Sequence, residues 1–89
     1  MNMNLPQQIE SLKAMIDEVL KDRGIPKNIR ATIEEVKSKI SAETPTSEDF
    51  SSAIYALDDI SNNINMPAYT RTSIWEIISE MERIKEEVK

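Results

Sequence analysis

The sequence predicts an all-α fold, an up-down-up-down four-helix bundle made of two pseudo-repeated helical hairpins. Four stretches carry apolar residues at alternating spacings of three and four, which is the pattern of amphipathic helices that pack side by side. Short segments containing Pro, Gly or Asn separate these stretches. Sliding the chain by 41 residues also places Pro26 on Pro67 and Arg30 on Arg71. Short connections make consecutive helices antiparallel neighbours, which gives the bundle.

The offset of 41 residues matches apolar positions along most of the chain. The matched pairs are Ile9 with Phe50, Ile16 with Leu57, Ile33 with Ile74, Val36 with Ile77 and Ile40 with Met81. A fixed period of this size is typical of a repeated supersecondary unit. We therefore expect one domain over residues 1–89, with hairpin repeats at about 5–41 and 46–88. A pair of stacked solenoid repeats is the alternative, but two such repeats bury little core.

The first hairpin is expected to contain helices from about residue 5 to 22 and from about 26 to 41. Asn4, followed by Gln7 three residues later, predicts a capping box at the first helix start. The two expected core stripes are Leu5, Ile9, Leu12, Ile16 and Val19, then Ile29, Ile33, Val36 and Ile40.

The second hairpin is expected to contain helices from about residue 47 to 64 and from about 67 to 88. Thr46 reads as the N-cap of the third helix, since Glu48 and Asp49 follow in its first turn. The expected stripes are Phe50, Ala53 or Ile54, Leu57, Ile60 and Ile64, then Thr70, Ile74, Ile77, Met81, Ile84 and Val88. Trp75 and Ile78 lie beside the last stripe and broaden it.

Both hairpin bends are expected to share one design. A residue tolerant of left-handed backbone ends the first helix, an apolar residue folds back on it, and a proline starts the next helix. The three positions are Gly24, Ile25 and Pro26 in one bend, and Asn65, Met66 and Pro67 in the other.

The amino-acid composition argues against most kinds of catalysis and metal binding. The chain of 89 residues has no cysteine and no histidine, so it lacks thiol nucleophiles, disulfides and the commonest general base and transition-metal ligand. We expect no enzyme activity, and no catalytic, cofactor-binding or metal-binding residues. An all-oxygen metal site at Asp58 and Asp59 is chemically allowed, but Leu57 and Ile60 turn at least one of these carboxylates outward.

Charge and hydropathy narrow the expected partners and location. The net charge is −5, and residues 45–89 carry nine acidic and four basic side chains. Such a surface repels phosphate backbones, so we expect no nucleic-acid partner. No apolar run approaches the roughly 20 residues of a membrane span, and no signal peptide is recognisable. We expect a cytoplasmic protein without a membrane partner.

Four residues form the candidate interaction surface: Arg30, Tyr69, Arg71 and Trp75. The two arginines sit in equivalent first turns, where the helix dipole does not favour positive charge. They are predicted either to bind carboxylates of the neighbouring helix, with Asp17, Asp58 and Asp59 as candidates, or to bind an anionic ligand or acidic partner.

Arg71 and Trp75 are four residues apart, so the guanidinium can lie over the indole. Tryptophan and arginine are typical interface anchors. The alternative, which we favour, is that Trp75 closes one end of the core.

Several segments resemble a known family. They are Ile25–Arg30, Leu57–Ile60, Asn65–Pro67 and Arg71–Trp75, in which proline, arginine and tryptophan recur at fixed spacing. Together the segments resemble a small uncharacterised archaeal protein family, and the resemblance covers nearly the whole chain. It implies an intracellular, all-helical protein of unassigned function, and it transfers no site residues.

These observations favour a non-enzymatic small protein-interaction module, which binds another protein or associates with itself. The alternative is an anion- or small-ligand-binding protein, or a minor enzyme, that uses Arg30 and Arg71 together with carboxylates.

Overall fold

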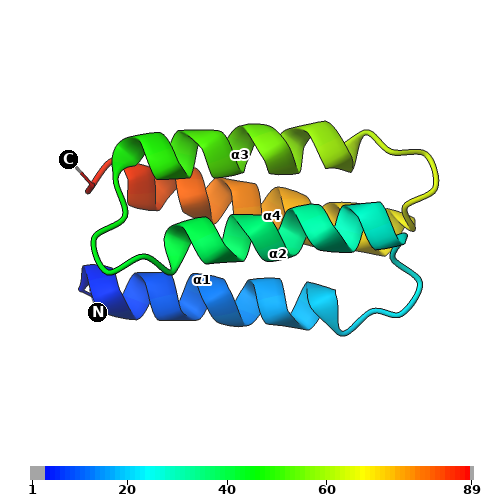
Figure 1. Cartoon of the computed structure of the whole chain (residues 1–89), viewed down its shortest axis with the longest axis horizontal. Helices are drawn as coiled ribbons and strands as arrows, with labels where there is room; N and C mark the ends of the chain where they lie inside the picture. The colour runs from blue at the N-terminus through cyan, green and yellow to red at the C-terminus, as the bar shows by residue number, and fades with distance from the viewer. Residues whose placement is uncertain (1–3, 89) are drawn as a thin grey trace.

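Four α-helices form an antiparallel bundle in the computed structural model, which describes residues 4–88 (Figure 1). They are α1 (Leu5–Leu20), α2 (Lys27–Ile40), α3 (Ser47–Ser61) and α4 (Ala68–Lys85). Residues 4–88 contain no strand. The predicted all-α four-helix bundle is confirmed. The predicted domain of residues 1–89 extends past the described part of the chain at both ends.

The helices form a ring in chain order. Helix α1 packs against α2 and α4, and α3 packs against the same two helices. Figure 1 shows the chain reversing at each connection, so the α1–α2 and α3–α4 bends share one end of the bundle. The α2–α3 connection lies at the other end, with the termini.

The core is aliphatic except for Phe50, which is fully buried. All four stripe residues predicted for α2 are buried, and so are the predicted stripe residues of α4 from Thr70 to Ile84. Leu5 and Ile9 are only partly buried and pack at the edge of the core. The helical period therefore predicts most of the core correctly.

The two predicted N-caps are present. Asn4 Oδ1 accepts a hydrogen bond from the Gln7 N–H at 2.9 Å, and Gln7 Oε1 accepts one from the Asn4 N–H. Thr46 Oγ1 accepts from the Asp49 N–H at 3.1 Å, and Asp49 Oδ2 accepts from the Thr46 N–H. Each reciprocal pair satisfies donors that a helix start otherwise leaves free.

The predicted left-handed residues are wrong. No described residue has a positive φ, so neither Gly24 nor Asn65 adopts that conformation. Instead, Asp22 Oδ1 accepts a hydrogen bond from the Gly24 N–H at 2.8 Å. In the second bend, Asn63 Oδ1 accepts one from the Asn65 N–H at 2.8 Å. The chain thus turns on a side-chain acceptor two residues earlier, as aspartate and asparagine commonly allow.

The rest of each bend follows the predicted order. Ile25 and Met66 are buried against the core. Pro26 and Pro67 occupy the N-cap positions of α2 and α4, with nearly identical backbone angles. The duplication itself remains a prediction from the sequence.

Helix α3 ends earlier than predicted. It stops at Ser61, and Ile64 is 89% exposed, so the assignment of Ile64 to the core stripe is wrong. The turn centred on Asn63 takes the chain out of helical geometry before Ile64 can face the bundle. Helix α4 also ends before the predicted limit, at Lys85.

Candidate functional site

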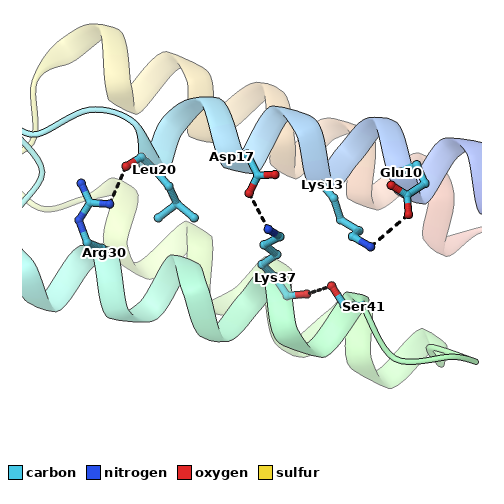
Figure 2. Close-up of polar contacts among 7 residues, drawn as sticks. All are labelled: Glu10, Lys13, Asp17, Leu20, Arg30, Lys37 and Ser41. Atoms are coloured by element: carbon cyan, nitrogen blue, oxygen red, sulfur yellow. Dashed lines mark hydrogen bonds and ion pairs between the residues drawn. The ribbon is translucent and has the colours of Figure 1, made fainter.

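Arg30 caps the end of α1. Its guanidinium donates to the Leu20 carbonyl at 2.5 Å and to the Asp22 carbonyl at 2.7 Å. Figure 2 shows the side chain reaching across to Leu20. Carbonyls in the last turn of a helix have no partner within the helix, so these bonds satisfy them. The predicted carboxylate partner Asp17 is wrong, because Asp17 bonds Lys37 instead.

Arg71 repeats this arrangement at the second bend. Its guanidinium donates to the Asn63 carbonyl at 3.1 Å, the position equivalent to Asp22. Its Nε is buried and has no hydrogen-bond partner among residues 4–88. The predicted carboxylate partners Asp58 and Asp59 are wrong for Arg71. Each arginine is held by the backbone of its own hairpin.

Asp22 connects the two hairpins. Its Oδ2 accepts hydrogen bonds from the Tyr69 hydroxyl at 2.8 Å and from Thr70 Oγ1 at 2.9 Å. The hydrogen bond from the Gly24 N–H has the largest effect on the pKa of the Asp22 carboxyl and lowers it. The bonds from the two hydroxyls lower it further. The hydrogen bond to Asp22 raises the pKa of Tyr69. Tyr69 is 65% exposed, yet its hydroxyl helps fasten α4 to the first bend.

A shallow groove of about 320 Å³ lies beside this contact, between α1 and α4. It is lined by Met15, Glu18, Val19, Asp22, Tyr69, Thr70, Ser73, Glu76 and Ile77. The hydroxyls of Tyr69 and Thr70 donate hydrogen bonds to the Asp22 carboxylate, so we interpret this contact as one that holds α4 against the first bend.

Trp75 does not belong to the core. It is 51% exposed, so the favoured prediction that it closes the end of the bundle is wrong. Trp75 lies six positions after Tyr69, which places the two side chains about 120° apart around α4. Tyr69 contacts the first bend. Trp75 is three and seven residues before Ile78 and Glu82, which places it on their flank of the helix by periodicity. The structure therefore does not bring Tyr69 and Trp75 into one cluster.

A second groove, of about 680 Å³, runs between α3 and α4. It is lined by Ser51, Ile54, Tyr55 and Asp58 from α3 and by Ile78, Glu82, Lys85 and Glu86 from α4 and its C-terminal end. We call it the α3–α4 groove. Tyr55 stands at its edge with 78% of its surface exposed. Trp75 lies one turn before Ile78 on the same flank, so it extends the apolar strip.

The aromatic residues are distributed unusually. The chain has one Trp, two Tyr and one Phe, and only Phe50 is buried. Tyr55, Tyr69 and Trp75 are exposed, and all three lie in the second hairpin. Aromatic side chains normally contribute most to a core because of their large apolar area. Here they are placed on one hairpin's surface.

The equivalent face of the first hairpin carries ion pairs within the chain, and the groove at its end, lined in part by Leu5, Ile9 and Ile40, has no aromatic residue. Lys37 Nζ lies 2.7 Å from Asp17 Oδ1, and Lys13 Nζ lies 3.2 Å from Glu10 Oε1 (Figure 2). These two ion pairs cover the flank where α1 meets α2.

The α1–α4 and α3–α4 grooves each contain an exposed tyrosine. Tyr69 of the first is bonded to Asp22, whereas the side chain of Tyr55 in the α3–α4 groove makes no hydrogen bond within residues 4–88.

Sequence reasoning missed Tyr55, although the 41-residue offset contained the signal. The offset pairs Tyr55 with Ala14, and Trp75 with Glu34. Where the offset pairs an aromatic residue with a small or charged one, the equivalent position in the other hairpin contributes no large apolar side chain to the core. The aromatic residue at such a position is therefore expected at the surface.

The described residues also bear on metal binding and on membrane insertion. Within residues 4–88, no group of three or more His, Cys, Asp or Glu side chains is arranged to hold a metal ion. None of the described helices has the length and apolar character needed to cross a membrane.

Fold and surface together define a small helical bundle with an open groove between α3 and α4 that contains an exposed tyrosine. Residues 1–84 match the family model of UPF0147, an uncharacterised protein family, and the chain belongs to it. The predicted resemblance to a small uncharacterised archaeal family is therefore confirmed.

Individual relatives agree with this assignment. The chain is 43% identical over 83 residues to UPF0147 protein MJ1419 of Methanocaldococcus jannaschii, covering 90% of this chain and 88% of that protein. It is 35% identical over 79 residues to a UPF0147 protein of Archaeoglobus fulgidus, covering 89% and 91%. The crystal structure of a protein of unknown function, MMP1188, superimposes with a TM-score of 0.83 at 35% identity, covering 92% of this chain and 94% of that one.

Proposed function

We propose that this protein is a non-enzymatic interaction module that binds a partner protein through the α3–α4 groove. The observation that carries the proposal is the exposure of Tyr55 in the lining of this groove and of Trp75 one helical turn before Ile78, while the core is built almost entirely of aliphatic residues. Tyrosine and tryptophan are enriched in protein interfaces because they bury much apolar area with few rotatable bonds.

The form of the surface supports the same proposal. A groove between two antiparallel helices, floored by Ile54 and Ile78, suits a protein segment that inserts apolar side chains. The proposal keeps Trp75 from the predicted interaction surface and adds Tyr55. It gives Arg30 and Arg71 a structural role, since both bond backbone carbonyls.

The alternative function, an anion site or minor enzyme at Arg30 and Arg71, has less support. Two donors of Arg30 are already bonded to carbonyls, and each arginine faces its own bend. The proposal includes no nucleic-acid partner, because the net charge of −5 opposes binding to a phosphate backbone. It also includes a cytoplasmic location.

Site-specific crosslinking tests the proposal. A photoreactive amino acid replaces Tyr55 in one variant and Ala14, its equivalent on the exposed face of α1, in a matched control. We expect irradiation in cells of the source organism to join residue 55 to one partner protein, and residue 14 to none in comparable yield. The partner should be lost when Trp75→Ala is added.

Equal crosslinking from both positions, or none from position 55, would remove the support for this groove. A crosslink between two copies of the chain would identify a homodimer interface, which light scattering of the purified protein would check.

A further inference from the structure

We infer that the segment bound in the α3–α4 groove is a basic amphipathic helix of the partner protein. This inference rests on the proposed function and adds the chemistry of the partner. Its apolar face would contact Tyr55, Trp75 and Ile78, and its lysine or arginine side chains would lie beside Asp58, Glu82 and Glu86.

The rim of the groove carries unbalanced negative charge. Asp58, Glu82 and Glu86 all line it, and Lys85 is the one basic residue among the lining residues. None of the three carboxylates has an ion-pair partner within residues 4–88. The hairpin as a whole has nine acidic and four basic residues between positions 45 and 89. An acidic partner would be repelled, and a basic one attracted.

The first hairpin shows how a carboxylate at this position is neutralised within the chain. Asp17 corresponds to Asp58 in the 41-residue offset, and Lys37 corresponds to Ile78. Asp17 and Lys37 form an ion pair at 2.7 Å. In the second hairpin isoleucine stands at the position of the lysine, so Asp58 has no ion-pair partner within residues 4–88 and lines the groove together with the apolar Ile78. The missing cation is the group that a partner would supply.

A helix suits this site better than an extended strand. A groove between two helices accepts the ridge of side chains on a third helix, and a helix satisfies its own backbone hydrogen bonds. The groove offers no sheet edge to which an extended segment could add, since residues 4–88 contain no strand.

A second copy of this chain fits the rim poorly. Residues 1–44 carry seven basic and seven acidic side chains, so the first hairpin is balanced. Lys13, Lys21 and Lys37 already pair with carboxylates of their own hairpin. Arg23 and Lys27 form no ion pair within residues 4–88, but a copy that offered them to the rim would also bring the seven carboxylates of the same hairpin, with no net positive charge.

Synthetic helices test the inference on the full chain. The probe is an amphipathic peptide of about 18 residues, long enough to span the groove, with leucine on one face and lysine on the other. One control peptide replaces every lysine with glutamate, and another scrambles the lysine peptide. Trp75, the chain's one tryptophan, reports binding by fluorescence. We expect the lysine helix to bind at least about tenfold more tightly than either control, and binding to weaken as salt rises.

A variant with reversed charge at the rim tests whether the carboxylates of the groove attract the lysine helix. Asp58→Lys/Glu82→Lys should weaken binding of the lysine helix by at least about tenfold. The matched control Glu34→Lys/Glu35→Lys makes the same change in net charge on the exposed face of α2, and should weaken it by less than about threefold.

Equal affinity for the lysine and glutamate helices, or an equal effect of the two double variants, would overturn the inference. Binding measurements with the partner protein that crosslinks to residue 55 distinguish a failure of this inference from a failure of the proposed function. If Tyr55→Ala/Trp75→Ala abolishes binding to that purified partner and the rim variant does not, the groove is an interface for a partner that is not basic. If neither variant affects binding, the proposed function fails as well.

Discussion

Arg30 and Arg71 occupy equivalent positions but make different numbers of hydrogen bonds. Arg30 donates to two carbonyls, and Arg71 donates to one. Hydrogen bonds that involve a charged group contribute roughly 1.5–3 kcal/mol each, and partial exposure to water lowers this to about 1–1.5 kcal/mol each for these arginines. We expect Arg30→Ala to lower the free energy of unfolding by about 2–3 kcal/mol, and Arg71→Ala by about 1–2 kcal/mol. Urea unfolding followed by circular dichroism measures both.

Arg23→Ala is the matched control, because Arg23 is exposed in the first bend and its side chain makes no hydrogen bond or ion pair within residues 4–88. Its effect should stay within about 0.5 kcal/mol. If both arginine variants kept full stability but lost partner binding, these side chains would belong to a binding site and their capping role would be secondary.

The hydrogen bonds to Asp22 make part of the stability depend on pH. Because they lower the pKa of the carboxyl in the folded state, the stabilisation is present above the ordinary aspartate pKa of about 4. It is lost as the pH falls through the lower folded-state value. Asp22→Asn removes the charge, so its deficit relative to the wild type should be full at neutral pH and shrink as the pH falls below about 4. Urea unfolding at about pH 7 and about pH 3 compares the two proteins.

Asp59→Asn provides the comparison, since Asp59 is exposed and its side chain makes no hydrogen bond or ion pair with the described part of the chain. Its difference from the wild type should be the same at both pH values. A deficit of Asp22→Asn that did not change with pH would show that the shape of the side chain matters and its charge does not.

At the scale of elements, helices are easier to predict than bends. The core stripes follow from the helical period, which identifies Leu12, Ile33 and Ile74 as core residues, and all three are buried. The bends are predicted from Gly24 and Asn65, whose residue types allow a left-handed backbone. The turns are built instead on Asp22 and Asn63, because a local side-chain acceptor competes successfully with that cap.

The bend geometry makes Gly24 replaceable. Its φ is not positive, so an added Cβ meets no backbone strain. That Cβ would lie 3.2 Å from Asp22 Oδ1, the end of a flexible side chain. Asn65 already carries a Cβ in the equivalent turn, with the same 2.8 Å hydrogen bond. We expect Gly24→Asn to leave stability unchanged or raise it by up to about 1 kcal/mol, since it restricts the unfolded chain.

Thermal unfolding of Gly24→Asn measures this effect. The reciprocal variant Asn65→Gly should leave stability unchanged or lower it by a similar amount. A loss above about 1 kcal/mol for Gly24→Asn would mean that Asp22 cannot shift, and that the two bends are less alike than their hydrogen bonds indicate.

At the scale of the whole molecule, two similar hairpins carry different surfaces. The sequence predicts the bundle because helix period and short connections suffice for it. It does not predict the α3–α4 groove, because Ile78 and Trp75 flank the core stripe. Apolar residues at flanking positions either join the core or stay exposed, depending on how closely the next helix approaches. Ile78 is 9% exposed and Trp75 is 51% exposed, a difference that depends on the packing of α3 against α4.

The contrast between Lys37 and Ile78 leads to a prediction for the whole binding face. Ile78→Lys would place an amine beside Asp58, as Lys37 lies beside Asp17 in the first hairpin. The new lysine would change the net charge of the groove lining from −2 to −1, because the lining already has three carboxylates and Lys85, and it would break the apolar strip next to Trp75. We expect the variant to keep its helical fold and to lose about 1–3 kcal/mol of stability, because Ile78 is nearly buried.

Binding of the basic helix should fall by more than about tenfold in Ile78→Lys, as measured by Trp75 fluorescence. Ile78→Gln is the control, since it removes the same apolar side chain without adding charge. If the proposed groove recognises both apolar and basic groups, the glutamine variant should bind more weakly than the wild type and more tightly than the lysine variant. Equal binding by the two variants would mean that apolar contact alone selects the partner.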